Sequence, residues 1–282
     1  MIMNKHIIKL GVIAFLFSSC HTEKKVEAVD TSSDNPVNYP ELTQERFTLQ
    51  LTDTLIKGSQ FPNYTIGLNL SFYNNENSVA ESVNKIINNK ITHTTIAPFD
   101  SSLTTYAQHL SKNIRQEILE AYDPDSEESN ATLQYHILIG GEFSPQPLNG
   151  YIAYTLCTDM YTGGPHGTRD ITYLNFEKST GKYVQKEDVF NISKDSVLLD
   201  LILRKIMSDR GVKTRKQLHE ISSITVVGDL YVENNFLLEE MGITFVYNTY
   251  EIASYADGTI FVFLPYEDMK DVLKIRPNSQ NQ

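Results

Sequence analysis

A short glycine-rich segment, residues 161–168 (Tyr-Thr-Gly-Gly-Pro-His-Gly-Thr), interrupts the most strand-like part of this sequence. Residues 150–160 before it and residues 169–177 after it both have the composition of β-strands. Glycine permits a positive φ and a close backbone approach, and proline fixes its own φ at about −65°. Three glycines and one proline within five residues therefore exclude a helix or a regular strand here. We predict a tight bend between two strands that holds the imidazole of His166.

Alternation of apolar and polar residues predicts further strands. In residues 64–72 a period of two places every apolar side chain on one face of a half-buried strand. These side chains are Tyr64, Ile66, Leu68, Leu70 and Phe72. Residues 230–237, 242–247 and 259–264 indicate shorter strands near the end of the chain.

Apolar residues at helical spacing predict helices at residues 78–91 and at about 101–122. Ser78 and Glu81 have the spacing of a capping box at the start of the first. Strands and grouped helices together indicate an α+β fold, with two α/β-layered subdomains, mainly antiparallel sheets and packed helices. Regular βαβ units are not indicated.

The bend suggests where the chain divides. We expect an N-terminal α+β domain at residues 45–160, a C-terminal α+β domain at residues 161–276 and a polar tail at residues 277–282. The strand before the bend can still pair with strands after it, in which case the two halves are fused rather than independent.

The amino terminus has the pattern of a targeting segment. Residues 1–19 combine an early positive charge with a short apolar run, and Phe17-Ser-Ser-Cys20 resembles a bacterial lipobox of the loose kind common in Bacteroidetes. We predict a lipoprotein signal peptide, lipidation of Cys20 and a flexible tether at residues 20–44. The alternative is an ordinary secretory signal with an incidental cysteine. The lipoprotein reading implies a lipid-anchored protein of the cell envelope, at the outer membrane and facing the periplasm.

Charge limits the partners. The formal net charge of −11 argues against nucleic acid, whose phosphates require clustered lysine and arginine. It also argues against docking on anionic lipid headgroups, so we expect membrane contact through the N-terminal lipid only.

Motifs for catalysis or cofactor binding are not found, and we expect no cofactor and no metal site. Cys157 is interpreted as a small packed strand residue rather than a reactive thiol. His166 is the one histidine in a special backbone setting, and we favour a role in holding the bend over a catalytic one. Tyr161, Tyr250 and Tyr255 lie at bends, so with His166 they are the candidate ligand-binding residues.

Several short motifs occur in a recognisable order. They are residues 161–167, 174–176, 180–182, 187–190, 243–245, 247, 250–255 and 257–258. In this order they resemble the carboxy-terminal domain of RsiV-type extracytoplasmic proteins. The half before the bend resembles the domain paired with it, which also precedes the catalytic domain of PdaC-type peptidoglycan deacetylases. The resemblance covers about residues 45–275, and Pro165 and Ser254 depart from the usual residues.

The resemblance implies a function in recognition. The RsiV-type module recognises lysozyme, which implies a lysozyme-like protein or peptidoglycan as the partner. The sigma-binding portion and transmembrane helix of the RsiV type, and the deacetylase domain of the PdaC type, have no counterpart in this sequence. We therefore expect a non-enzymatic binding or sensing module. The alternative is an envelope carbohydrate or peptide hydrolase centred on His166, which would require that imidazole to lie in a cleft beside a carboxylate.

Overall fold

The computed structural model describes residues 39–56, 61–94, 98–224 and 229–277, and these belong to one compact unit. The signal segment, Cys20 and all of the polar tail but its first residue lie outside the described residues, so their assignments stay predictions. The fold class is confirmed: the chain is an α+β protein with mostly antiparallel sheets.

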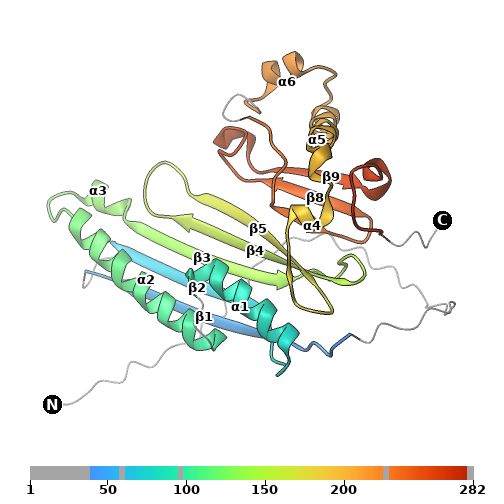
Figure 1. Ribbon diagram of the computed structural model, residues 1–282. Coiled ribbons are helices and arrows are strands. Elements are labelled where there is room, and N and C mark those ends of the chain that lie inside the picture. The colour runs from blue at the N-terminus through green and yellow to red at the C-terminus, as the bar shows by residue number, and fades with distance from the viewer. Residues whose placement is uncertain (1–38, 57–60, 95–97, 225–228, 278–282) are drawn as a thin grey trace, which may run out of the picture. The chain divides into compact units, whose positions relative to one another are not determined.

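Six strands form the larger sheet, in the spatial order of the sequence (Figure 1). They are β1 (Gln44–Thr54), β2 (Asn63–Tyr73), β3 (Gln134–Phe143), β4 (Tyr151–Tyr161), β5 (Thr168–Glu177) and β6 (Tyr183–Val184). All neighbours are antiparallel except β2 and β3, which are parallel. A parallel pair needs a long crossover connection, and two helices supply it.

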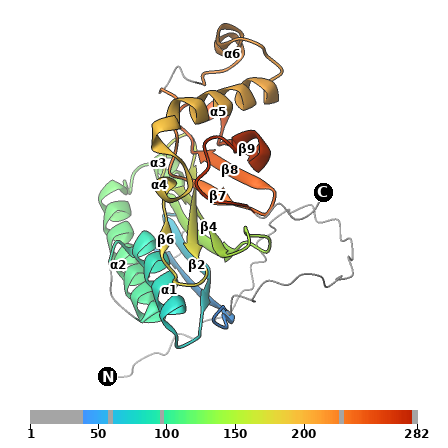
Figure 2. The same cartoon turned by 45° about the vertical axis from the view of Figure 1, so that its right-hand side comes forward.

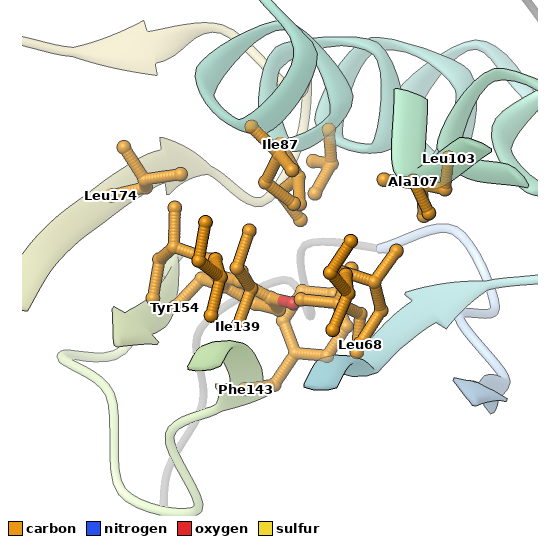
Figure 3. Packing of buried hydrophobic residues seen from close by; sticks show 14 of the residues in the cluster. Leu68, Ile87, Leu103, Ala107, Ile139, Phe143, Tyr154 and Leu174 are labelled. Atoms are coloured by element: carbon orange, nitrogen blue, oxygen red, sulfur yellow. The ribbon is translucent and has the colours of Figure 1, made fainter. Parts of the chain in front are cut away.

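These helices, α1 (Ser78–Thr92) and α2 (Phe99–Ala121), cover one face of the sheet, and a short α3 (Glu127–Ala131) precedes β3. Figure 3 shows side chains of both helices over those of the strands. The labelled helix residues are Ile87, Leu103 and Ala107, and the labelled strand residues include Leu68, Ile139 and Tyr154. The alternation predicted for residues 64–72 places four of its five apolar side chains in this core, while the fifth, Phe72, is only half-buried.

The start of α1 differs in detail from the prediction. Asn77, not Ser78, is the N-cap, and its side chain accepts from the backbone N–H groups of Val79 and Ala80. Asparagine and serine are about equally good N-caps, so the two adjacent residues compete and the sequence does not decide between them.

Three further strands form a second sheet in the order β7 (Phe236–Leu238), β8 (Gly242–Tyr247) and β9 (Ile260–Pro265), all antiparallel (Figure 2). The helices of this part are α4 (Lys186–Val189), α5 (Asp195–Asp209) and α6 (Arg215–Ile221). Single 3-10 turns occur at η1 (Ile192–Lys194), η2 (Tyr255–Asp257) and η3 (Tyr266–Met269). One face of the sheet packs with α5 into a second core.

One strand boundary predicted from the sequence was wrong. Strand β7 includes only the end of the predicted residues 230–237, and the preceding residues run as irregular backbone. In the larger sheet, Gly140 and Gly141 lie within β3. A Cβ on Gly141 would lie 2.2 Å from Tyr154 Oη, so the absence of a side chain at Gly141 makes room for the Tyr154 ring. The hydroxyl of that ring donates to the carbonyl oxygen of Ser71.

Asparagine side chains join the two sheets. Asn235 and Asn248 bond the outer backbone edge of β5: Asn235 Oδ1 accepts from Tyr173 N at 2.8 Å and Asn248 Oδ1 accepts from Ile171 N at 2.8 Å. The amide nitrogen of Asn235 also donates to Ile171 O at 2.7 Å. These amides take the place of a neighbouring strand along an edge that β6 leaves uncovered.

Asn175 is a third asparagine that joins the sheets, and its side chain lies on β5 and bonds the backbone edge of β7. From β5 it donates to Phe236 O at 2.6 Å and accepts from Leu238 N at 2.9 Å, so it satisfies two backbone groups of β7. Its side chain is buried, as are both partners. We call the three residues Asn175, Asn235 and Asn248 the asparagine joint.

Strands β4 and β5, which lie on either side of the bend, pair along ten residue pairs, so the two halves of the sequence share one sheet. This is the arrangement that the fused alternative requires, while the boundary at residues 160 and 161 stays a prediction. Tyr39, where the described chain begins, lies at the other end of the β4–β5 hairpin: its ring is 4.7 Å from Lys178 Nζ and its hydroxyl lies beside Gly150.

Among the residues that the structure describes, no helix combines the length and the apolar character that crossing a membrane requires.

Candidate functional site

The predicted bend connects β4 to β5. Gly163 and Gly164 adopt φ values of 87° and 92°, which other residues rarely tolerate. The hydroxyl of Tyr161 donates to Gly164 O at 3.0 Å, and a Cβ on Gly167 would lie 2.8 Å from the carbonyl oxygen of Met160. Glycine at these positions therefore lets the chain turn back tightly enough to present His166.

A second segment, between β8 and β9, meets this bend. Its backbone turns at Tyr250, whose N–H donates to Ala253 O at 3.1 Å, and again at η2, which begins with Tyr255. Tyr250 has φ = 70°, the left-handed region, where a bulky aromatic residue is an outlier.

Three of the four predicted ligand-binding residues come together here. The rings of His166 and Tyr255 stack with centroids 3.7 Å apart and an interplanar angle of 17°. The ring of Tyr250 lies 6.5 Å from that of His166 and 6.2 Å from that of Tyr255. Tyr250 is 51% exposed and Tyr255 42% exposed. We call His166, Tyr250 and Tyr255 the aromatic cluster.

Tyr161, the fourth predicted residue, lies apart from the aromatic cluster. Its ring stacks on His136 at 5.7 Å, on the face of the large sheet opposite the helices. His136 was not predicted, although its place on an alternating strand beside buried Tyr135 and Ile137 indicates an exposed side chain.

Both ring nitrogens of His166 have partners. Nδ1 lies 3.2 Å from Gly167 O, and because a carbonyl oxygen only accepts, Nδ1 carries the proton and donates. Nε2 then accepts from the hydroxyl of Tyr250 at 3.4 Å, a long contact. The imidazole thus links its own bend to the second segment, and neither partner is a carboxylate.

The carboxylate of Asp257, whose side chain is 10% exposed, holds η2 in place. Asp257 Oδ2 accepts from Ser223 N at 2.9 Å and from Ser223 Oγ at 2.6 Å, and Arg210 Nη1 lies 3.6 Å from Oδ1. Burial alone would raise the pKa of Asp257, but the hydrogen bonds from Ser223 and the charge of Arg210 outweigh it and lower the pKa. No local sequence pattern indicates this role of Asp257, because its partners lie far away in the chain.

Negative charge gathers beside Tyr250. Burial raises the pKa of Glu251, and the nearby carboxylates of Glu233 and Asp170 raise it further, while the hydrogen bond from Asn248 N opposes the rise. Burial is the main cause of the raised pKa, and the smaller effects of Glu233 and Asp170 show that further carboxylates lie near Glu251. Carboxylates grouped in this way suit a positively charged ligand group.

Cys157 lies on the same sheet face as Tyr161. Burial raises the pKa of its thiol, while a hydrogen bond from Arg169 Nε at 3.2 Å opposes the rise. Asp159 Oδ1 forms an ion pair with Arg169 Nε at 3.3 Å. A thiol with a raised pKa is a poor nucleophile, which agrees with a packing role. Among the described residues, no group of three or more histidine, cysteine or carboxylate side chains is arranged to hold a metal ion.

The segment between β8 and β9 lies in a region that matches a known protein family. Residues 187–267 match the model of DUF3298, a protein family of unknown function. The DUF3298 stretch contains Tyr250 and Tyr255 but neither His166 nor Tyr161.

Solved structures of DUF3298 proteins share the fold over most of the chain. A family member from Bacteroides fragilis NCTC 9343 matches with a TM-score of 0.77 and 24% identity, covering 85% of this chain and 96% of that one. A DUF3298 family protein from Pseudomonas aeruginosa PAO1 matches with a TM-score of 0.59 and 14% identity, covering 83% and 95%. No curated protein matches the chain. At these identities the likeness shows the fold alone.

Proposed function

We propose that this chain is a non-enzymatic, lipid-anchored binding or sensing module of the cell envelope, whose recognition surface is the aromatic cluster. Its partner is an envelope protein, such as a lysozyme-like protein, or a cell-wall glycan. The resemblance to the RsiV-type and PdaC-type extracytoplasmic domains supports this choice of partner. The DUF3298 match over residues 187–267 is compatible with it.

The main support for the proposal is the backbone conformation of Tyr250. A tyrosine at φ = 70° is strained by roughly 1–2 kcal/mol relative to glycine, and asparagine is also tolerated there. Yet the side chain is 51% exposed, so its burial does not offset the strain. Strained residues concentrate at functional sites. A large aromatic face held at the surface in an unfavourable conformation is readily explained if the ring contacts a partner.

The chemistry of the cluster fits both partner classes. Exposed tyrosine faces stack on sugar rings, and they attract lysine or arginine side chains through the negative charge of the ring face. The net charge of −11 and the carboxylates around Glu251 favour a basic protein partner, with an affinity that falls as salt rises.

Substitution of Tyr250 by asparagine tests the proposal. Asparagine tolerates a positive φ, so Tyr250→Asn is expected to keep or slightly raise the melting temperature while binding is lost at least tenfold. Binding would be measured by calorimetry against lysozyme and against soluble peptidoglycan fragments, at low and at high salt.

Tyr231→Leu is the matched control, because Tyr231 is 43% exposed and lies outside the aromatic cluster. It is expected to leave the affinity unchanged. Equal affinity of the chain and of Tyr250→Asn for every ligand that binds would contradict the assignment of this surface. Turnover of a glycan or peptide that is lost in His166→Ala would favour the hydrolase alternative instead.

A further inference from the structure

The free edges of the two sheets differ in how they are protected. An unpaired strand edge is a template for another strand, and proteins usually protect it with charges, short length or a covering segment. The asparagine joint covers the edges of β5 and β7. Strand β6 has only two residues. Strand β1 carries Glu45, Arg46 and Asp53.

Strand β9 has no charged residue and no covering strand among the described residues, and its one protecting residue is Pro265 at its last position. Within the described part of the chain it pairs with β8 alone, and residues 259–265 contain no charged residue. Ile260, Val262 and Leu264 face the core beneath α5, whereas Phe261 and Phe263 alternate with them and are 48% and 37% exposed. The edge is therefore both unpaired and apolar on its outer face.

The residue pattern of β9 identifies the occupant, because this strand is complementary to a second copy of itself. Two copies of a chain with a net charge of −11 repel each other over most of their surfaces, so a contact between them is confined to an uncharged segment such as β9. In an antiparallel pairing centred on Val262, Phe261 lies opposite Phe263 of the partner subunit, and Phe263 lies opposite Phe261 of the partner subunit. Cross-strand aromatic pairs of this kind stabilise antiparallel sheets.

We propose that β9 is a self-association edge, through which a second copy of this chain extends the three-stranded sheet by antiparallel β9–β9 pairing. The phenylalanine faces are small compared with the roughly 800 Å² per partner of a stable interface. The dimer is therefore weak, and the fraction of chains that it contains rises with protein concentration. This inference does not depend on the proposed recognition function, because it uses none of the residues of the aromatic cluster.

Sedimentation equilibrium over a roughly hundredfold range of concentration tests the self-association. The full chain is expected to show a concentration-dependent shift from monomer to dimer, and Phe261→Lys or Phe263→Lys to weaken it at least tenfold. Ile221→Lys is the matched control, because Ile221 is 56% exposed on α6, and it is expected to leave the shift unchanged. Circular dichroism would confirm that each variant folds. A chain that stays monomeric throughout, or a lysine at Ile221 with the same effect, would overturn the proposal.

Cysteine cross-linking tests the register. In chains that also carry Cys20→Ser and Cys157→Ser, Phe261→Cys and Phe263→Cys would be prepared separately with different tags. A disulfide bridges Cα atoms less than about 7 Å apart, which the proposed register satisfies only between residue 261 of one copy and residue 263 of the other. Oxidation of the mixture is expected to give mixed-tag dimers, while each variant alone gives few. Equal cross-linking in all three samples, or none in the mixture, would exclude this pairing.

Discussion

Removal of the Asn175 side-chain amide is the most direct test of what holds the two sheets together. In Asn175→Leu the side chain keeps a similar volume but bonds neither Phe236 O nor Leu238 N. Both groups lie on fully buried residues. Each buried polar group left without a partner costs about 1–3 kcal/mol, so we expect a loss of roughly 2–6 kcal/mol in the free energy of unfolding.

Urea denaturation followed by circular dichroism and tyrosine fluorescence would measure the loss, since the chain has 16 tyrosines and no tryptophan. Asn69→Ala is the control: its side chain bonds Arg46 on the exposed face of the sheet, and its removal is expected to change stability by less than about 0.5 kcal/mol. An equally small effect of Asn175→Leu would refute the reasoning, because it would mean that water or a backbone shift satisfies the two groups.

Asn175→Asp separates the donor from the acceptor. A carboxylate can still accept from Leu238 N, but it cannot donate to Phe236 O and it places a charge in the core. Burial raises the pKa of the introduced carboxyl in the folded state above its unfolded value. The folded state then binds the proton more tightly, so the stability deficit is smallest at low pH and grows as the pH rises through the folded pKa.

Two further predictions concern the core and the support of the aromatic cluster. Gly141→Ala is expected to destabilise the chain by about 1–3 kcal/mol, because its Cβ would overlap the hydroxyl of Tyr154; in a double-mutant cycle by urea denaturation, Tyr154→Phe should recover part of that loss. Asp257 has a folded pKa below its ordinary value of 3.8, so the stability that it contributes is present above that value and is lost as the pH falls through the folded pKa. Acid titration of Asp257→Asn should therefore show a shallower loss of stability below about pH 4 than the unchanged chain, and parallel curves would contradict the role of Ser223 and Arg210 as its partners.

Local patterns predicted the elements of this fold well. The alternation in residues 64–72 matches β2, and the glycine-rich bend lies where its glycines and proline required it. Errors arose where nearby residues compete or where the structure depends on distant contacts. Asn77 replaced Ser78 as a cap. In the predicted strand at residues 230–237, the side chains of Asn234 and Asn235 instead accept from the backbone N–H groups of Lys186 and Tyr173.

The sequence selected each residue of the candidate site separately, but it did not predict which of these residues meet in space. His166, Tyr161, Tyr250 and Tyr255 were each selected because they lie at bends, and nothing local indicates that the hydroxyl of Tyr250 bonds an imidazole 84 residues away. The asparagine joint links β5, which follows the bend, to Asn248, which precedes Tyr250, and the residues of the joint have no periodicity. Tyr161 was selected because it lies at a bend, yet it is the last residue of β4 and its ring stacks on His136 instead of joining the aromatic cluster.

The position of Tyr39 has a geometric consequence. Tyr39 lies beside Gly150 at the start of β4, and the bend that carries His166 follows the other end of the same strand. Eleven residues of strand, at about 3.3 Å each, hold these two points about 35 Å apart. If the polypeptide before Tyr39 is a tether to a lipid surface, that tether enters the folded part at one end of β4, and the aromatic cluster lies at the other end of the same strand.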